Sequence, residues 1–130
     1  MLKFINLTSL TLYCSFIFWL SSQQALPTPM LFIHQDKIHH MGAYFIMAIF
    51  AWRFFSDYFD KSLVIIVASI SFCSIYGLSD EWHQSYVPGR DADLLDWLAD
   101  TIGASIAVLF IQLLKNKFKN KKTRPQADRV

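Results

Sequence analysis

Four apolar runs, separated by short polar segments, dominate the pattern of the sequence. They cover residues 4–20, 38–55, 62–79 and 94–114. Each run approaches the roughly 20 residues that an α-helix needs to cross about 30 Å of hydrocarbon. The pattern therefore predicts an all-α integral membrane protein, built as a bundle of four transmembrane helices.

The polar segments between the runs carry residues that end helices and reverse the chain. Residues 21–29 hold two prolines, two serines and two glutamines, which predict a loop. The short polar stretch at residues 56–61 makes the second and third runs an antiparallel hairpin. Pro88 and Gly89 form a turn dipeptide that should reverse the chain before the fourth run.

The first run has an alternative interpretation as a cleaved signal peptide. Lys3 supplies a charged start, and Ala25 is a small residue near a cleavage point. The run is longer than the apolar region of a typical signal peptide, however, and Gln23 interrupts the small-x-small pattern. We therefore expect the first run to be a retained span.

Composition agrees with a membrane protein, and the distribution of charge predicts its orientation. Hydrophobic residues make up 54% of the chain, and seven of its 12 lysines and arginines lie in residues 115–130. Short segments rich in Lys and Arg stay in the cytoplasm, so the C-terminus should be cytoplasmic, and four spans place the N-terminus there too. We expect residues 1–114 to form the transmembrane domain and residues 115–130 a flexible basic tail.

With this topology, polar residues at the ends of the second, third and fourth runs lie together on the outer side. A carboxylate at membrane depth costs at least ~2.5 kcal/mol, so acidic residues in an apolar run indicate a partner or a function. Asp80 and Asp91 are expected to be interfacial caps rather than members of the group. The candidate ligand-binding residues, called the polar site below, are Asp36, Lys37, His40, Glu81, Gln84, Arg90, Asp93, Asp96 and Asp100.

Two stripes of these residues should face each other. Asp93, Asp96 and Asp100 recur at i, i+3 and i+7, so they share one face of a helix. Lys37 and His40 start a similar stripe on the second run, and the least costly arrangement packs it against the acidic one. The result is either a satisfied polar core that fixes helix register or a functional site. We favour a functional site because the acids outnumber the lysine and arginine.

The order and spacing of these residues resemble the pattern of the VanZ-like family. The shared features, within residues 36–110, are Asp36-Lys37-x-x-His40, Glu81-x-x-Gln84, Pro88-Gly89-Arg90, Asp93, Asp96 and Gly103. Many members carry Asn where this chain has Asp100, so one more acid enters the site here. The family takes its name from a protein associated with low-level resistance to the glycopeptide teicoplanin. The resemblance implies a small four-span protein of the bacterial inner (plasma) membrane.

Three classes of function fit the polar site. In the first, a cell-envelope protein binds a lipid head group, peptide or glycopeptide, with Arg90 and Lys37 holding an anionic group and the carboxylates a cationic one. In the second, a membrane-embedded hydrolase or transferase uses Glu81 or Asp96 as general base and His40 or His83 as proton shuttle. In the third, a structural or regulatory subunit uses the polar residues only to fix helix register.

Other functions find no support in the sequence. It contains no Gly-x-Ser-x-Gly, no glycine-rich phosphate loop and no His-Glu-x-x-His, and its lysine-rich tail lacks the interleaved aromatics of a nucleic-acid-binding surface. We predict no cofactor and no metal ion. A metal-dependent enzyme would gather Glu81, Asp96, Asp100 and His40 around one divalent ion, but Lys37 and Arg90 would compete for the carboxylates. The expected partners are the lipid bilayer, the envelope ligand and, through small residues at 103–107, a second copy of the chain.

Overall fold

The computed structural model describes residues 1–24 and 31–123, and in these ranges the chain forms four α-helices and no strand. They are α1 (Leu2–Ser21), α2 (Gln35–Ser56), α3 (Ser62–Gln84) and α4 (Leu94–Thr123). The all-helical fold predicted from the apolar runs is confirmed. Residues 25–30, which include much of the predicted first loop and Ala25, and residues 124–130 of the predicted tail lie outside the described residues.

Two helices run further than the apolar pattern predicts. α3 continues past residue 79 to Gln84, because no proline or glycine follows in the chain until Pro88. α4 continues through residues 115–123, so the first half of the basic tail is helical. Hydropathy marks where an apolar run ends, whereas a helix continues until its residues no longer favour it.

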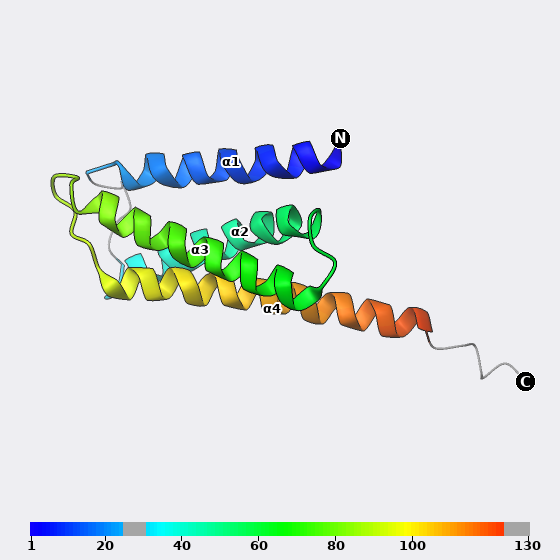
Figure 1. Ribbon diagram of the computed structural model, residues 1–130. Helices are drawn as coiled ribbons and strands as arrows, with labels where there is room; N and C mark the ends of the chain where they lie inside the picture. Colours follow the sequence, from blue (N-terminus) through cyan, green and yellow to red (C-terminus); the bar gives the residue numbers. More distant parts are fainter. Residues whose placement is uncertain (25–30, 124–130) are drawn as a thin grey trace, which may run out of the picture.

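The four helices lie side by side in antiparallel order (Figure 1). The N-terminus, the α2–α3 turn and the projecting end of α4 lie at one end of the bundle, and the α3–α4 connection lies at the other. This order brings the first turns of α2 and α4 next to the last turn of α3. The segments that carry the polar site are thereby gathered at one end.

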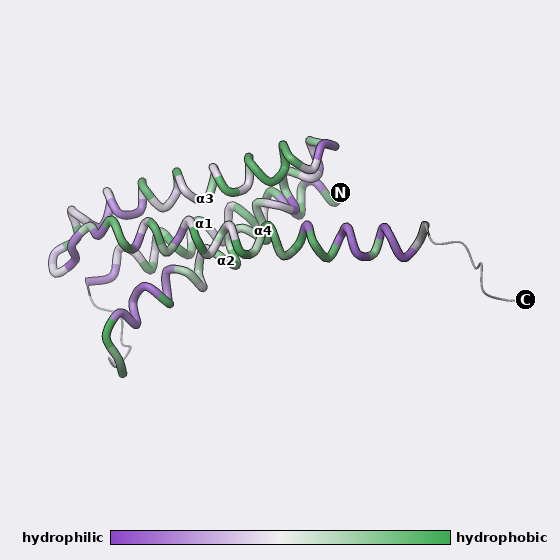
Figure 2. The backbone as a smooth tube through the Cα atoms, turned by 90° about the horizontal axis from the view of Figure 1, so that it is seen from below, coloured by the Kyte–Doolittle hydropathy of each residue, from purple (hydrophilic) through white to green (hydrophobic). Residues whose placement is uncertain are grey.

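The hydropathy of the helices fits a membrane for three of the four. α1, α3 and residues Leu94–Lys121 of α4 are long and apolar enough to cross a bilayer. α2 is not among these three, and it opens on the polar residues Gln35, Asp36 and Lys37. The tube in Figure 2 is mostly hydrophobic or neutral along the middle of the bundle and hydrophilic toward its ends. Four spans therefore remain a prediction, with α2 as the open case.

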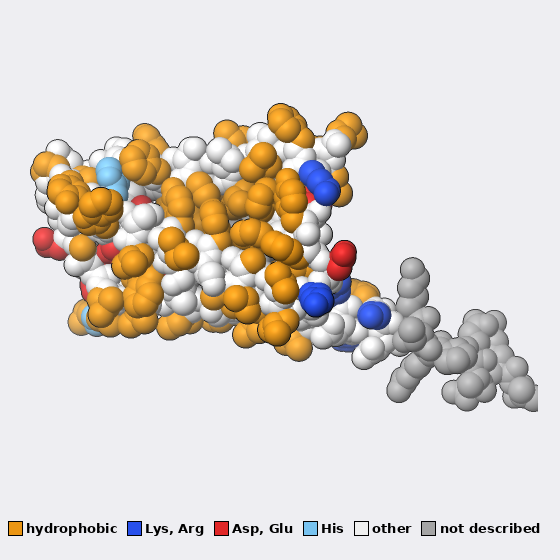
Figure 3. Space-filling view, in the orientation of Figure 1, with side chains coloured by type: hydrophobic (Ala, Val, Ile, Leu, Met, Phe, Trp, Pro, Cys, Tyr) orange, Lys and Arg blue, Asp and Glu red, His pale blue; other side chains and the backbone are white. Residues whose placement is uncertain are grey.

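The surface divides in the same way. On the face shown in Figure 3, apolar side chains cover the middle of the bundle. The lysines and arginines visible there gather at the end that carries the termini, whereas most of the visible carboxylates and the histidines gather at the opposite end. On this face, one end of the bundle is therefore mainly basic and the other mainly acidic.

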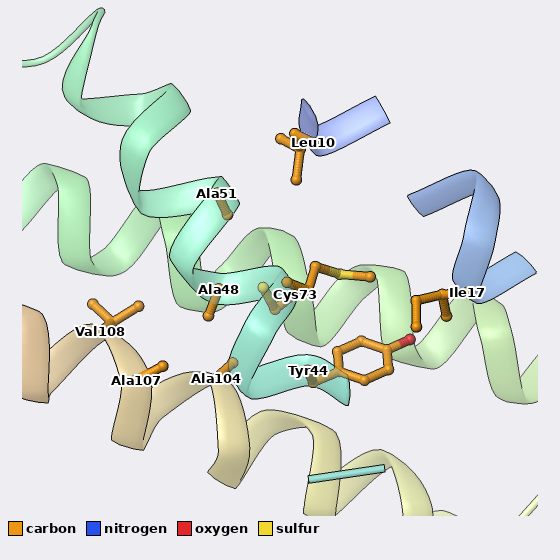
Figure 4. Packing of buried hydrophobic residues seen from close by; sticks show 10 residues of the cluster. Leu10, Ile17, Tyr44, Ala48, Ala51, Cys73, Ala104, Ala107 and Val108 are labelled. Atoms are coloured by element: carbon orange, nitrogen blue, oxygen red, sulfur yellow. The ribbon is translucent and has the colours of Figure 1, made fainter. Parts of the chain in front are cut away.

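Small residues let α2 and α4 approach closely in the core. Four alanines of these two helices are fully buried in the core: Ala48, Ala51, Ala104 and Ala107 (Figure 4). A Cβ at Gly103 would lie 2.9 Å from the carbonyl carbon of Met41, closer than real Cβ atoms come. The small-residue face of α4, which the sequence also offers to a second copy of the chain, is packed against α2 within one chain.

Candidate functional site

The nine residues of the polar site lie at the end of the bundle that carries the α3–α4 connection, in two groups. Seven are joined through Lys37, His40 and Glu81, and the other two, Gln84 and Arg90, contact each other. Burial is deep for charged side chains, since Glu81 is 4% exposed and Asp100 has no exposed surface. Buried charges require compensation, so the contacts of each group decide what the site can do.

Lys37 lies at the centre of the larger group. Its Nζ forms an ion pair with Asp93 and lies 2.8 Å from Oδ1 of Asp96 and 3.0 Å from Oδ2 of Asp36. The two stripes therefore face each other, as their spacing predicts. The hydrogen bond from Lys37, followed by the one from the backbone N–H of Leu95, lowers the pKa of the Asp93 carboxyl below its usual value.

His40 faces carboxylates from both neighbouring helices. Its Nδ1 lies 3.0 Å from Oδ1 of Asp100 and 4.0 Å from Oε1 of Glu81, and its Nε2 lies 3.9 Å from Oδ2 of Asp96. Gly77 of α3 gives Asp100 its space, since a Cβ at that position would lie 2.8 Å from Oδ2 of the carboxylate. The imidazole is thus held among three acids.

Glu81 connects α3 to the start of α4. Its Oε2 accepts a hydrogen bond of 2.7 Å from the backbone N–H of Asp93. Its Oε1 and the Oδ2 of Asp100 are buried, and neither has a hydrogen-bond partner among the described residues. One ligand atom each from His40, Glu81 and Asp100 lies within 4.8 Å of the others, so these three side chains form a group that could hold a metal ion.

Arg90 and Gln84 form the second group, at the α3–α4 connection. Gly89, with a φ of +83°, adopts the left-handed conformation that the turn before Arg90 requires. Nη2 of Arg90 donates a hydrogen bond of 2.6 Å to Oε1 of Gln84, and Nε2 of Gln84 donates one of 3.3 Å to Oδ2 of Asp80. Within residues 1–24 and 31–123, no carboxylate forms an ion pair with Arg90. A neutral amide therefore orients the guanidinium.

Two residues differ from the sequence interpretation. Asp80 was expected to be an interfacial cap, but it is 5% exposed and belongs to the site through Gln84. The sequence contains a signal for this position, because Asp80 lies four residues before Gln84 and residues at i and i+4 share a helix face. His83, proposed as a proton shuttle, instead stacks on Phe18 and places Nε2 3.0 Å from Oγ of Ser22. It contacts α1 and the residue after it rather than the carboxylates of the polar site.

Two cavities adjoin the polar site. One, of about 100 Å³, has His40, Gln84 and Arg90 in its lining. The other, of about 620 Å³, lies between α3 and α4 and is lined mostly by apolar side chains, with Glu81 and Asp93 among them. The first has room for water or a small polar group, and the second is in the size range of ligand pockets.

The chain is similar to known proteins over most of its length. Residues 3–115 match the sequence model of the family described as VanZ/LLP1. The chain is 32% identical over 111 residues to the Uncharacterized protein C11E3.10 of the fission yeast Schizosaccharomyces pombe, an alignment that covers 83% of this chain and 62% of the relative. The chain thus spans less than two thirds of that protein. No solved structure matches significantly.

Proposed function

Because the chain belongs to the VanZ/LLP1 family and three of its helices are long and apolar enough to cross a membrane, we propose that it is a multi-pass membrane protein whose polar site binds an anionic head group. α2 supplies the fourth span, and both termini lie in the cytoplasm. The polar site then opens to the outer side of the bacterial inner (plasma) membrane. The ligand class is an envelope molecule that presents phosphate or carboxylate there.

The contrast between Lys37 and Arg90 carries this proposal. Lys37 contacts three carboxylates, so its charge is used within the protein. Arg90 is oriented by Gln84 and has no ion pair among the described residues, so its charge is left for a ligand. A guanidinium offers a planar fork of N–H donors that matches both oxygens of a phosphate or carboxylate. Lys37, and not Arg90, neutralises Asp93 and Asp96, so Arg90 has no such structural role.

The cavity that contains Arg90 favours an amphiphilic ligand. Its lining combines the apolar side chains of Ile17, Leu20 and Ala43 with His40, Gln84 and Arg90 of the polar site. An acyl chain against the apolar lining would therefore place its head group beside Arg90. A lipid-borne phosphate or carboxylate matches both parts of this lining, whereas a free anion contacts only the polar part.

A membrane-embedded hydrolase is the second candidate, and one contact favours it. His40 lies 3.0 Å from the fully buried Asp100, with Glu81 on the same side of the ring. A carboxylate that orients an imidazole is a common arrangement for general-base catalysis. Binding of an anionic head group at Arg90 would precede such a reaction, so the binding experiment applies to both candidates.

The test compares the native protein with Arg90→Lys in detergent micelles. Lysine keeps the charge but loses the planar two-pronged hydrogen bonding, so affinity for phosphatidic acid should fall about tenfold, or roughly 1.4 kcal/mol. Fluorescent phosphatidic acid, inorganic phosphate and fluorescent phosphatidylcholine serve as the lipid anion, the free anion and the head-group control. Native protein should bind phosphatidic acid most tightly.

Arg53→Lys is the matched control, because Arg53 is exposed and lies at the end of α2 remote from the polar site. It should bind phosphatidic acid as the native protein does. Equal affinity of the Arg90→Lys and native proteins, at equal folded yield, would defeat the proposal and favour a structural role for the polar site. Teicoplanin susceptibility of bacteria expressing the same variants tests the envelope phenotype that the family resemblance suggests.

A further inference from the structure

Three helices bring one imidazole and two carboxylates together in a group that the capture of a head group by Arg90 leaves unused. His40 comes from α2, Glu81 from α3 and Asp100 from α4, and their ligand atoms lie within 4.8 Å of one another. We propose that these three side chains bind a divalent metal ion.

Two buried oxygens of this group indicate that a cation belongs there. Oε1 of Glu81 and Oδ2 of Asp100 have no hydrogen-bond partner among the described residues. Both side chains are more than nine-tenths buried. A buried acceptor without a partner destabilises the fold, and more strongly when it is charged. A metal ion held by Oε1 of Glu81 and by the carboxylate of Asp100 gives Oε1 a partner and offsets the charge on both carboxylates.

In the described residues, neither Lys37 nor Arg90 forms an ion pair with Glu81 or Asp100, so the competition with a metal ion expected from the sequence does not arise. Lys37 contacts Asp36, Asp93 and Asp96, and Arg90 contacts Gln84. In the part of the chain that the structure describes, the only side chain with a cationic form in ion-pair range of the two carboxylates of the group is the histidine. Two carboxylates carry more negative charge than one histidine can balance, so a bound cation would complete the balance.

The distances and the donor atoms suit a transition metal. Two ligands at about 2.0–2.2 Å from a tetrahedral Zn²⁺ lie roughly 3.3–3.5 Å apart. Nδ1 of His40 lies 3.0 Å from Oδ1 of Asp100 and 4.0 Å from Oε1 of Glu81, which brackets that value. One imidazole with two carboxylates suits Zn²⁺ or Mn²⁺, whereas Mg²⁺ prefers oxygen ligands alone.

Neighbouring groups support the three ligands. Oε2 of Glu81 accepts the backbone N–H of Asp93, and Oδ2 of Asp96 lies 3.9 Å from Nε2 of His40, where a metal-bound histidine usually faces a carboxylate. Three protein ligands leave a position for water or an anion. The proposed metal site is part of the polar site, but it is inferred from the three ligands and not from which anion Arg90 binds.

The experiment measures metal binding by the full-length protein in detergent. Protein treated with a chelator is incubated with Zn²⁺, Mn²⁺ or Mg²⁺, and bound metal is counted by mass spectrometry after gel filtration. The native protein should retain about one Zn²⁺ or Mn²⁺ per chain and no Mg²⁺. Bound metal should also raise the melting temperature, and Co²⁺ substitution should give visible absorption bands.

The variants Asp100→Asn and His40→Gln remove one ligand each with little change in volume, and each should weaken metal binding at least about tenfold. Asp91→Asn and His39→Gln change exposed neighbours of the same types and should bind as the native protein does.

A native protein that retains no Zn²⁺ or Mn²⁺ would overturn the metal site, whether or not the ligand variants fold. Equal metal content in the ligand and control variants would overturn it as well, since the metal would then lie elsewhere. The phosphatidic acid affinity of Arg90→Lys tests only the proposed function, and metal content tests only the metal site. Either proposal can therefore fail without the other.

Discussion

At the scale of single residues, the polar site depends on which cation each carboxylate meets. Lys37 holds three aspartates, of which Asp36 and Asp93 are partly exposed and Asp96 is buried. His40 is the cation-forming partner of the deeper acids, Glu81 and Asp100. An exposed ion pair contributes little to stability, whereas buried acids depend strongly on their partners. The deeper group is therefore the sensitive part of the site.

The contact between Lys37 and Asp93 predicts a dependence of stability on pH. The pKa of Asp93 is lowered in the folded protein, so its contribution is present above the unfolded pKa, about 4, and is lost as pH falls through the folded value. Asp93→Asn should lower stability at pH 7 and make its decline in acid shallower. Melting temperatures measured from about pH 6 to pH 3 check this. Asp91→Asn is the control, and a native acid profile in Asp93→Asn would contradict the prediction.

At the scale of the helices, the α2–α4 contact aligns the two polar stripes. The backbones approach closely because Gly103 faces the main chain of Met41 and because the alanines along the interface are small. Without this approach, Lys37 and His40 could not reach the aspartates of α4. The packing of small residues thus determines the geometry of the polar site directly beside it.

Substitution of the two glycines near this contact separates packing from helix propensity. Gly103→Ala places a Cβ against backbone atoms of Met41, which cannot rotate away, so it should destabilise the fold by about 1–3 kcal/mol. Gly42→Ala, in α2, meets nothing within 4 Å and should be neutral or stabilise by up to about 1 kcal/mol. Unfolding followed by circular dichroism in detergent checks both. Equal effects of the two substitutions would contradict close α2–α4 packing.

At the scale of the whole molecule, the bundle has a basic end and an acidic end. The lysines and arginines visible in Figure 3 lie near the termini, and the polar site lies at the opposite end. Positive charge stays on the cytoplasmic side of a membrane, so this polarity favours an outward polar site. The position of α2, which opens on charged residues, decides whether the chain crosses four times.

Cysteine labelling tests that topology. A cysteine at the exposed Ser85, in a chain with Cys14→Ala, should react with an impermeant reagent added to intact cells. A cysteine at the exposed Asp60, in the α2–α3 turn, should react only after the membrane is opened. A reporter fused to the C-terminus should read cytoplasmic. Protection of position 85 together with labelling of position 60 would reverse the orientation.

The sequence by itself determined the helices and the end of the bundle at which the polar residues gather. These features follow from runs of apolar residues and from i, i+3, i+7 spacing, which are local properties of the chain. It also predicted that Lys37 would meet the acidic stripe of α4, because an unpaired carboxylate at that depth is costly.

Only the tertiary structure decided how the charges are shared. Asp80 is buried, His83 contacts α1, and Arg90 rests on Gln84 while Lys37 takes the aspartates. These outcomes depend on how closely the helices approach, and Gly103 allows the close approach of α4 to α2 by leaving out a side chain. Sequence spacing specifies the face of one helix, but burial and pairing arise only when a second helix approaches it.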